Sequence, residues 1–341
     1  MTRTRREFIQ TLGAAGLGAA GVGAAGAALG VAGLASEGRA QSKWPERPIR
    51  VIVPYTAGGF TDNMARTVCQ QLEERLGTSI VIDNKPGANS IIGVDMLSRA
   101  KPDGYTFGVV IAAFAANTTL YPKLPYDPAK DFQPVALIGI SPLVAAVNKD
   151  LPYKDAKELI DYARANPGKI SFASSGNGAA AHLTAELLKS VTKTDMVHVP
   201  YKGASPALVD LIGGQVELFF DAASGLIQPG RDGRVRLIGV ASDKRLPALP
   251  DVPTFQEQGI ENFTGSTWAG MLAPAGTPRE IVDRMAREIT EVLQMPEIQQ
   301  RFEDPFGTFP AGGTPEEFEK FLAEETKKWG DVIRAAGLKG E

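Results

Sequence analysis

Two loops rich in glycine and hydroxyl side chains carry the residue types that could bind an anion. The first is P-Y-T-A-G-G-F-T-D at 54–62, and the second is A-S-S-G-N-G-A-A-A-H at 173–182. An apolar run of strand type precedes each loop, and a helical pattern follows it. A helix that starts after such a loop presents free backbone N–H groups and the positive end of its dipole. We therefore interpret both loops as candidate anion sites.

Each loop also has a purely structural interpretation. Thr61 or Asp62 could cap the next helix, which would make the first loop an ordinary strand-to-helix turn. His182 lies one turn into the second helix, where a histidine packs, caps the helix or contacts a ligand. Gly58 and Gly59 allow the backbone to approach a ligand closely, but two glycines are not a specific motif. Neither the G-x-G-x-x-G nor the P-loop fingerprint is present.

A third group of polar residues follows other predicted strands. Asn89 precedes a helical pattern, whereas Tyr201 and Asp221 come directly after strand-like runs and could point into the same crevice. Trp268 belongs to this softer group, with packing as the alternative. The candidate ligand-binding residues are therefore Tyr55, Thr56, Ala57, Gly58, Gly59, Thr61, Asp62, Asn89, Ser174, Ser175, Gly176, Asn177, Gly178, His182, Tyr201 and Asp221.

Enzyme chemistry finds little support in the residue types. The chain has only two histidines, His182 and His198, and one cysteine, Cys69. It contains no G-x-S-x-G elbow, no H-E-x-x-H motif and no Cys/His spacing typical of a metal site. No spacing singles out a pair of catalytic carboxylates. We therefore expect no catalytic residues, no metal and no cofactor.

Composition and charge narrow the class of partner. The 341 residues are 43% hydrophobic and 22% charged, which is ordinary for a globular protein with enough chain for two lobes. Residues 1–40 hold four arginines and two glutamates, so the rest of the chain carries a formal charge of −5 against −3 for the whole. An acidic body argues against nucleic acid as a partner. Cys69 cannot form an internal disulfide and falls on the apolar side of a predicted helix, which predicts burial.

The elements that must position the loops alternate between strands and helices. The first stretch comprises predicted strands at 49–53, 80–83 and 105–111 and predicted helices at 65–76 and 91–100. This β-α-β-α-β order predicts a parallel, doubly wound sheet that binds ligands beyond the carboxyl ends of its strands. The alternation continues through 143–240, beginning with a predicted strand at 143–147. Thr277 and Thr314, each followed by Pro and by Glu at the third position, predict capping boxes for two later helices.

The first forty residues are typical of an export signal. T-R-R-E-F-I at 4–9 is a twin-arginine signature, and a weakly apolar Gly/Ala stretch follows at 12–35. The alternative of a transmembrane helix is disfavoured because glycine is costly in helices and large apolar side chains are few. A small-x-small pattern predicts cleavage after Ala40, with Ala35 as the alternative.

The chain resembles the Bug-type solute receptors of tripartite tricarboxylate transporters. The stretches that carry the resemblance occur in order along the mature chain: W-P-E-R-P-I at 44–49, V-P-Y-T-A-G-G at 53–59 with Asp62, Ala65 and Arg66, N-K-P-G-A at 84–88, K-P-D-G-Y-T at 101–106, V-P-Y-K-G at 199–203 and L-P-D-V-P-T at 249–254. Tyr55, where family members commonly carry Phe, and the twin-arginine signal are departures from the family pattern.

The resemblance implies a type II periplasmic-binding fold, in which two α/β lobes enclose a ligand cleft. Lobe one would hold residues 41–143 plus 241–341, and lobe two residues 144–240. The family holds carboxylates through backbone amides, hydroxyls and bridging waters from two loops, which correspond here to residues 55–62 and 174–182. A monomeric periplasmic receptor is expected, with a small carboxylate ligand and the subunits of an inner-membrane permease as its partners.

Three functions remain open at this point. The first is a receptor that captures a mono-, di- or tricarboxylate by lobe closure and delivers it to the permease. The second is a sensor that presents its liganded lobes to a membrane kinase, which would use the same binding site. The third, a periplasmic enzyme on the same fold, is disfavoured because the sequence shows no catalytic constellation.

Overall fold

A computed structural model describes residues 44–340, and the predicted export signal lies outside the described residues. None of the helices in this range is both long enough and apolar enough to cross a membrane. In chain order the elements are β1 (Ile49–Val53), α1 (Phe60–Leu76), β2 (Ile80–Asn84), α2 (Ile91–Ser98), β3 (Thr106–Ile111), α3 (Ala112–Leu120), β4 (Phe132–Asn148), α4 (Ala156–Ala165), β5 (Ile170–Ser174), α5 (Ala180–Thr192), β6 (Met196–Pro200), α6 (Ala204–Ile212), β7 (Leu218–Ala222), α7 (Ala223–Arg231), β8 (Val235–Val240), β9 (Ser266–Pro274), α8 (Arg279–Leu293), α9 (Pro296–Glu303), β10 (Phe309–Gly312) and α10 (Pro315–Ala335).

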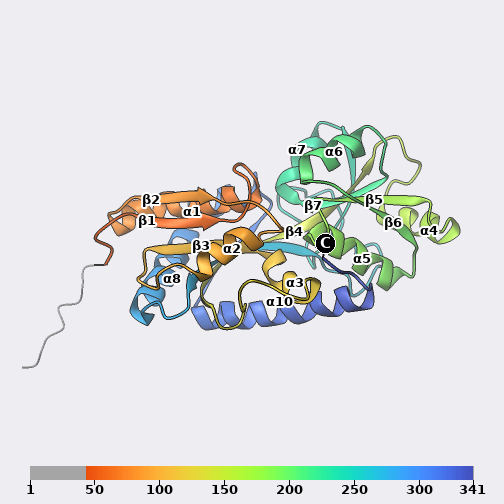
Figure 1. Cartoon of the computed structure of the whole chain (residues 1–341). Coiled ribbons are helices and arrows are strands. Elements are labelled where there is room, and N and C mark those ends of the chain that lie inside the picture. Colours follow the sequence, from red (N-terminus) through yellow and green to blue (C-terminus); the bar gives the residue numbers. More distant parts are fainter. Residues whose placement is uncertain (1–43, 341) are drawn as a thin grey trace, which may run out of the picture. The chain divides into compact units, whose positions relative to one another are not determined.

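The strands of the described chain form one hydrogen-bonded ladder in the order β2-β1-β3-β9-β4-β7-β5-β6, and β8 and β10 also pair with β4 (Figure 1). β1 runs parallel to β2 and β3, and β5 runs parallel to β6 and β7. These two parts confirm the predicted β-α-β alternation. The first three strands are parallel, as the sequence predicted. Between the two parallel parts, β9 and β4 are antiparallel to their neighbours, so the ladder as a whole is mixed.

Strand β4 connects the two parallel parts of the ladder (Figure 1). Its first half pairs with β9 and β10, and its second half pairs with β7 and β8. The sequence predicted only residues 143–147 of this 17-residue strand. Pro134 and Pro142 kept the first half of β4 from being predicted as a strand, because proline lacks the N–H that a central strand donates. The ladder accommodates Pro134 through a register shift opposite β9.

Two large hydrophobic cores support the two parts of the ladder. One contains Val51, Phe107 and Met285 and packs β1 and β3 against α1 and α8. The other is built from buried residues between 143 and 263, around β5, β7 and β8. Phe255 and Phe263 belong to this second core, whereas the division expected from the sequence assigns their segment to lobe one.

The predicted helix boundaries have mixed outcomes. Thr314 forms the predicted capping box at α10: its hydroxyl accepts from the backbone N–H of Glu317, and the Glu317 carboxylate accepts from the N–H of Thr314. Thr277 does not cap α8, because its hydroxyl donates to the carbonyl of Pro274 and the helix begins at Arg279. A Thr-Pro-x-Glu pattern therefore predicts a helix start here but not its capping geometry.

Cys69 is a packing residue, as the sequence predicted. It lies on the buried face of α1 with 3% of its surface exposed. Burial, with a smaller contribution from Glu73, raises the pKa of its thiol to about 12. The thiolate is therefore not populated at neutral pH, and Cys69 is no nucleophile.

Candidate functional site

A cavity of about 460 Å³ lies where the carboxyl ends of strands from the two parallel parts of the ladder meet. Its lining residues follow or end β1, β3, β5, β6 and β7, which is where open α/β sheets bind ligands. The lining comprises Tyr55, Thr56, Gly58, Gly59, Phe60, Thr61, Asn63, Asn89, Ile111, Ala113, Leu143, Ser175, Ala179, Ala180, Ala181, Ala204, Ser205, Asp221, Ala222, Ser224, Gly225, Thr267, Pro305 and Phe306.

Five helices begin at this cavity. The first residues of α1, α3, α5, α6 and α7, or the residues just before them, all belong to its lining. The first four N–H groups of a helix have no partner within the helix, and the dipole makes this end positive. Five such ends around one small cavity therefore create a positive potential without a charged side chain.

The starts of these five helices also lack side-chain caps. The N-cap residues of α1, α3, α5, α6 and α7 make no side-chain hydrogen bond to the first turn. Missing caps alone are not diagnostic, since α8 and α9 lack them too. The convergence on one cavity is what matters, because an anion placed there can accept from several first-turn N–H groups. No Lys, Arg or His occurs among the described residues that line the cavity.

Thr267 adds a buried hydroxyl without a partner. It lies on β9 in the cavity lining, only 5% of its surface is exposed, and its Oγ1 makes no hydrogen bond within the described chain. A buried polar atom without a partner costs free energy in a folded protein. A ligand oxygen in the cavity would provide the missing partner.

The first loop contributes backbone and hydroxyl groups to the cavity, and its acid holds the loop in place. Asp62, 2% exposed, accepts hydrogen bonds from the N–H of Gly58 at 2.8 Å, Nε of Arg66 at 2.8 Å and Nδ2 of Asn84 at 2.9 Å. Burial raises the pKa of Asp62, but these three bonds outweigh that effect and hold the pKa below its ordinary value. Asp62 and Ala57, both predicted as ligand-binding residues, do not line the cavity.

Ser175 and the alanines at 179–181 bring the second loop to the cavity, and the rest of the loop lies behind it. Ser174 is fully buried, and its hydroxyl is 3.0 Å from the carbonyl of Gly176 and 2.7 Å from Nε2 of His198. The N–H of Gly178 donates to Nδ1 of His182 at 3.1 Å. Of the residues predicted here, only Ser175 lines the cavity, whereas Ser174, Gly176, Asn177, Gly178 and His182 do not. The buried His182 and the half-buried His198 thus support the loop from the side away from the cavity.

The residues of the third predicted group lie in different places. Asn89 and Asp221 line the cavity, but Tyr201 does not. The hydroxyl of Tyr201 donates to the carboxylate of Asp210 at 2.7 Å, which directs it to α6. Trp268 is fully buried and donates through Nε1 to Glu325 on α10, a packing role.

The backbone beside Asn89 is strained. Ala88, Asn89 and Ser90 have φ values of 46°, 47° and 75°, three successive left-handed residues without a glycine. Such residues persist only where the surroundings hold them, and they gather at ligand sites. Here the Asn89 side chain is fixed by Asn117, whose Oδ1 accepts from Nδ2 of Asn89 at 2.9 Å and whose own amide donates to the Asn89 carbonyl.

Several lining residues were missed by the sequence reasoning. They are Phe60 and Asn63 on α1, the alanines at 179–181, the starts of α3, α6 and α7, the strand residues Leu143 and Thr267, and the turn at 305–306. One signal was available: A-S-G at 223–225 directly follows β7, and A-S-P at 204–206 follows β6 after a short turn. Small residues at a strand's carboxyl end leave room for a ligand. The residues contributed by β9 and by 305–306 come from distant parts of the chain and had no local signal.

Reactive chemistry at the site is limited. The described residues contain no cluster of three or more His, Cys, Asp or Glu side chains that could hold a metal ion. Ser174 and His198 form a serine–histidine contact, but Ser174 has no exposed surface and does not line the cavity. Burial, followed by Lys189, lowers the pKa of His198 to about 4. The arrangement is suited to holding an anion and presents no activated nucleophile.

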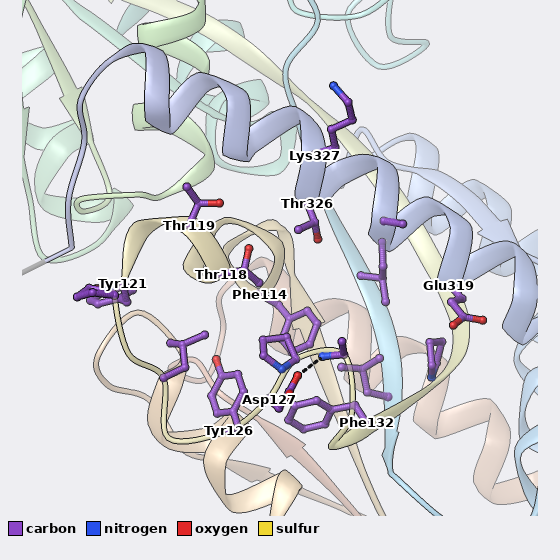
Figure 2. Close-up of a pocket in the computed structure, with 18 of the residues that line it drawn as sticks. Phe114, Thr118, Thr119, Tyr121, Tyr126, Asp127, Phe132, Glu319, Thr326 and Lys327 are labelled. Carbon is purple, nitrogen blue, oxygen red and sulfur yellow. Dashed lines mark hydrogen bonds between the residues drawn. The ribbon is translucent and has the colours of Figure 1, made fainter.

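A larger cavity of about 890 Å³ lies between α10 and the segment that connects α3 to β4 (Figure 2). Phe114, Tyr126 and Phe132 form an aromatic wall, and side chains of α10 face them. Helix α3 contributes Phe114 from its first turn and Thr118 and Thr119 from its last turn. That end of the helix is negative. Asp127, Glu319, Lys327 and Arg334 also line the larger cavity, so its acidic and basic side chains balance. The convergence of five helix starts favours the smaller cavity as the anion site.

Comparison with known proteins identifies the family of the chain. Residues 64–338 match the family model described as the tripartite tricarboxylate transporter family receptor. The periplasmic binding protein BugD is 35% identical with a TM-score of 0.78, over 87% of this chain and all of that one. Rpa4515 of R. palustris, solved with adipate, is 34% identical with a TM-score of 0.81, over 87% of this chain and 99% of that one. MatC of Rhodopseudomonas palustris, solved with bound malate, is 32% identical with a TM-score of 0.76, over 85% of this chain and all of that one.

The extent of these matches decides the family. The family model spans most of the described chain. The three structures cover the same fold at identities well above those that indicate only a shared fold. The chain belongs to the tripartite tricarboxylate transporter receptors, a family of periplasmic solute-binding proteins that includes the Bug proteins.

Proposed function

We propose that this protein captures a small carboxylate in the cavity at the starts of α1, α3, α5, α6 and α7 and delivers it to an inner-membrane permease of the tripartite tricarboxylate type. The observation that carries the proposal is the convergence of five helix starts on a cavity whose described lining holds no basic side chain. Carboxylate oxygens are suited to accept from these N–H groups and from Thr267. The malate and adipate in MatC and Rpa4515 support the ligand class.

Lobe closure is the proposed capture step. Lobe one would comprise residues 41–143 plus 241–341 and lobe two residues 144–240. Of the residues assigned to lobe one, we propose that the segment 241–263 nevertheless moves with lobe two, because Phe255 and Phe263 pack in the core of that part. Strands β4 and β9 would flex where they connect the two parts of the ladder. Closure would shield the carboxylate from water and strengthen its bonds to the helix starts.

Delivery to a permease requires export of the receptor. We propose that the receptor acts as a monomer in the periplasm and that T-R-R-E-F-I at 4–9 directs it there by the twin-arginine route, with cleavage after Ala40. Replacing Arg5 and Arg6 by Lys is expected to leave the uncleaved precursor in the cytoplasm. Export of that variant at the wild-type rate would contradict the route without affecting the proposed ligand.

A thermal-shift panel tests the ligand class. Acetate, malate, adipate, citrate and benzoate are compared with putrescine and glucose at equal concentration and ionic strength. A ligand that binds only the folded state stabilises it by RT ln(1 + [L]/Kd), so at least one carboxylate should raise the melting temperature. Stabilisation by putrescine or glucose, with none by any carboxylate, would contradict the proposal.

A further inference from the structure

Asp221 is the only acidic side chain among the described residues that line the cavity. It lies in β7, just before the start of α7, and its carboxylate accepts a hydrogen bond from the N–H of Ala222. A Cβ atom added at Gly225 would lie 2.4 Å from Oδ2 of Asp221. The missing side chain at residue 225 therefore makes room for the carboxyl group at the start of α7.

No opposite charge from the described part of the chain balances this carboxyl group. β4 and β5, which pair with β7, contain no titratable side chain. The charged or titratable groups on the helices packed against β7 are His182, Glu186 and Lys189 on α5, Asp210 on α6 and Arg231 on α7. None of these described side chains forms an ion pair or hydrogen bond with Asp221. In the lining itself, Tyr55 is the only other titratable group.

An ionised Asp221 conflicts with the proposed ligand. Two carboxylates in one cavity of about 460 Å³ would repel each other in a medium that screens charge poorly. When two acids share such a site, one of them takes up a proton. The ligand is held by five helix starts, whereas Asp221 has one N–H donor, so the proton goes to Asp221.

We propose that Asp221 is a specificity-determining residue that binds the ligand as a neutral carboxylic acid and donates a hydrogen bond to a ligand oxygen. The inference rests on the proposed function. Binding then takes up one carboxylate ligand and one proton from solvent, and the proton resides on the Asp221 carboxyl group. The residue selects a ligand with an acceptor oxygen at this position and disfavours one with an ammonium group there, which would require the ionised acid.

The protonation of the unliganded protein agrees with this role. Burial raises the pKa of Asp221 to about 7, and the bond from Ala222 offsets only part of this effect. The acid is thus poised to gain a proton when a second negative charge enters. Above pH 7 the Asp221 carboxyl group is mostly ionised before the ligand binds, so binding must draw a proton from solvent. The affinity for the ligand should therefore fall by up to about tenfold per pH unit.

Isothermal titration calorimetry tests the inference on the mature protein. Malate, adipate and citrate are titrated at pH 6, 7 and 8 in phosphate and in Tris, whose different ionisation enthalpies reveal proton uptake. The wild type should take up close to one proton per ligand at pH 8 and bind about fivefold more weakly than at pH 7, because the free acid is already partly protonated at pH 7. Asp221→Asn, which mimics the neutral acid, should take up none and bind with little dependence on pH. Asp195→Asn, at an exposed acid outside the cavity, should behave as the wild type does.

The outcomes separate the two proposals. Binding of a carboxylate without proton uptake by the wild type would contradict the role of Asp221 and leave the proposed function intact. A folded Asp221→Asn protein that binds at no pH would also contradict it, because the ionised acid would then be required. If none of the three carboxylates produces heat with the wild type, the proposed function itself is contradicted. Circular dichroism verifies the fold of each variant.

Discussion

The imidazole rings of His182 and His198 stack face to face, with centroids 3.7 Å apart and planes inclined by 9°. Each ring also supports the second loop, His182 by accepting from the N–H of Gly178 and His198 by its contact with Ser174. Burial, then His198 and Lys189, lowers the pKa of His182 to about 3, and burial, then Lys189, lowers that of His198 to about 4. The loop is therefore held by two neutral rings.

This stack predicts that the protein loses stability on mild acidification. Below pH 6.5 the unfolded chain protonates its histidines, whereas the folded pair stays neutral until about pH 4, so the unfolded state binds more protons. The contribution is complete above pH 6.5 and falls by up to about 1.4 kcal/mol per pH unit for each histidine as the pH drops. Urea unfolding at pH 7.5, 6.5, 5.5 and 5.0 measures this loss as a change in the free energy of unfolding.

Replacing one histidine tests whether the stacked pair causes this dependence of stability on pH. The chain contains no other histidine, so His198→Gln should make the dependence on pH between 6.5 and 5.0 clearly shallower, at some cost in stability at pH 7.5. Equal free energies of unfolding for the wild type at pH 6.5 and 5.0 would show that the rings are not neutral in the folded state.

Asp221 should affect stability in the opposite direction. Its pKa is raised in the folded protein, so the folded state binds more protons between the unfolded value near 3.8 and about 7, and stability is lost as the pH rises through this range. Asp221→Asn removes the ionisable group. We expect the variant to be more stable than the wild type at pH 8 and nearly equal to it at pH 4, by chemical unfolding without ligand. A less stable variant at pH 8 would show that the ionised carboxylate has a partner in the fold.

Thr267→Val should weaken carboxylate binding without harming the fold. The change replaces the Thr267 hydroxyl, which has no partner, by a methyl group of similar shape, so stability should be unchanged or slightly higher. A hydrogen bond to a charged group contributes about 1.5–3 kcal/mol, which corresponds to a roughly tenfold or greater rise in Kd. Isothermal titration calorimetry with malate and adipate measures the Kd of the variant and of the wild type.

Thr67→Val is the matched control. The Thr67 hydroxyl on α1 is also buried without a partner, but this residue does not line the cavity. Its replacement should leave Kd unchanged. Equal affinities for the Thr267→Val, Thr67→Val and wild-type proteins would remove β9 from the site.

Gly59→Val should obstruct the cavity from the first loop. The backbone at Gly59 is extended, with φ −78° and ψ 175°, and an added Cβ would lie 3.6 Å from the carbonyl of Thr56, an ordinary contact. Any residue fits this conformation, so the fold should be retained while the isopropyl group occupies space beside the helix start. Affinity should decrease in the order Gly, Ala, Val with little change in melting temperature. Unchanged affinity of a folded Gly59→Val protein would exclude the first loop from ligand contact.

Local sequence signals were enough to find the two loops and the α/β alternation, because each depends on neighbouring residues. Gly58 and Gly59 after a buried strand, and Ser175 after another, were recognisable from a run of apolar residues and the helix that follows. These are the residues that the structure brings to one cavity. Their role as ligand contacts remains a prediction.

The direction of individual side chains could not be predicted in this way. Asp62 and His182 are the most polar members of their loops, yet both point into the protein, where Arg66 and His198 partner them. Thr267 reaches the cavity because β9 pairs with β4 and β3, a contact between distant segments. Such pairings depend on the assembled sheet, so the sequence around residue 267 contains no local pattern that predicts them.

The most direct test is a crystal structure of the mature protein grown with the carboxylate that stabilises it most in the thermal-shift panel. We expect one carboxylate group to lie in the cavity between the starts of α1 and α5 and to accept hydrogen bonds from first-turn N–H groups. A ligand oxygen should lie within hydrogen-bonding distance of Thr267 Oγ1. A carboxylate bound only in the larger cavity beside α10, with the smaller cavity filled by water, would contradict it.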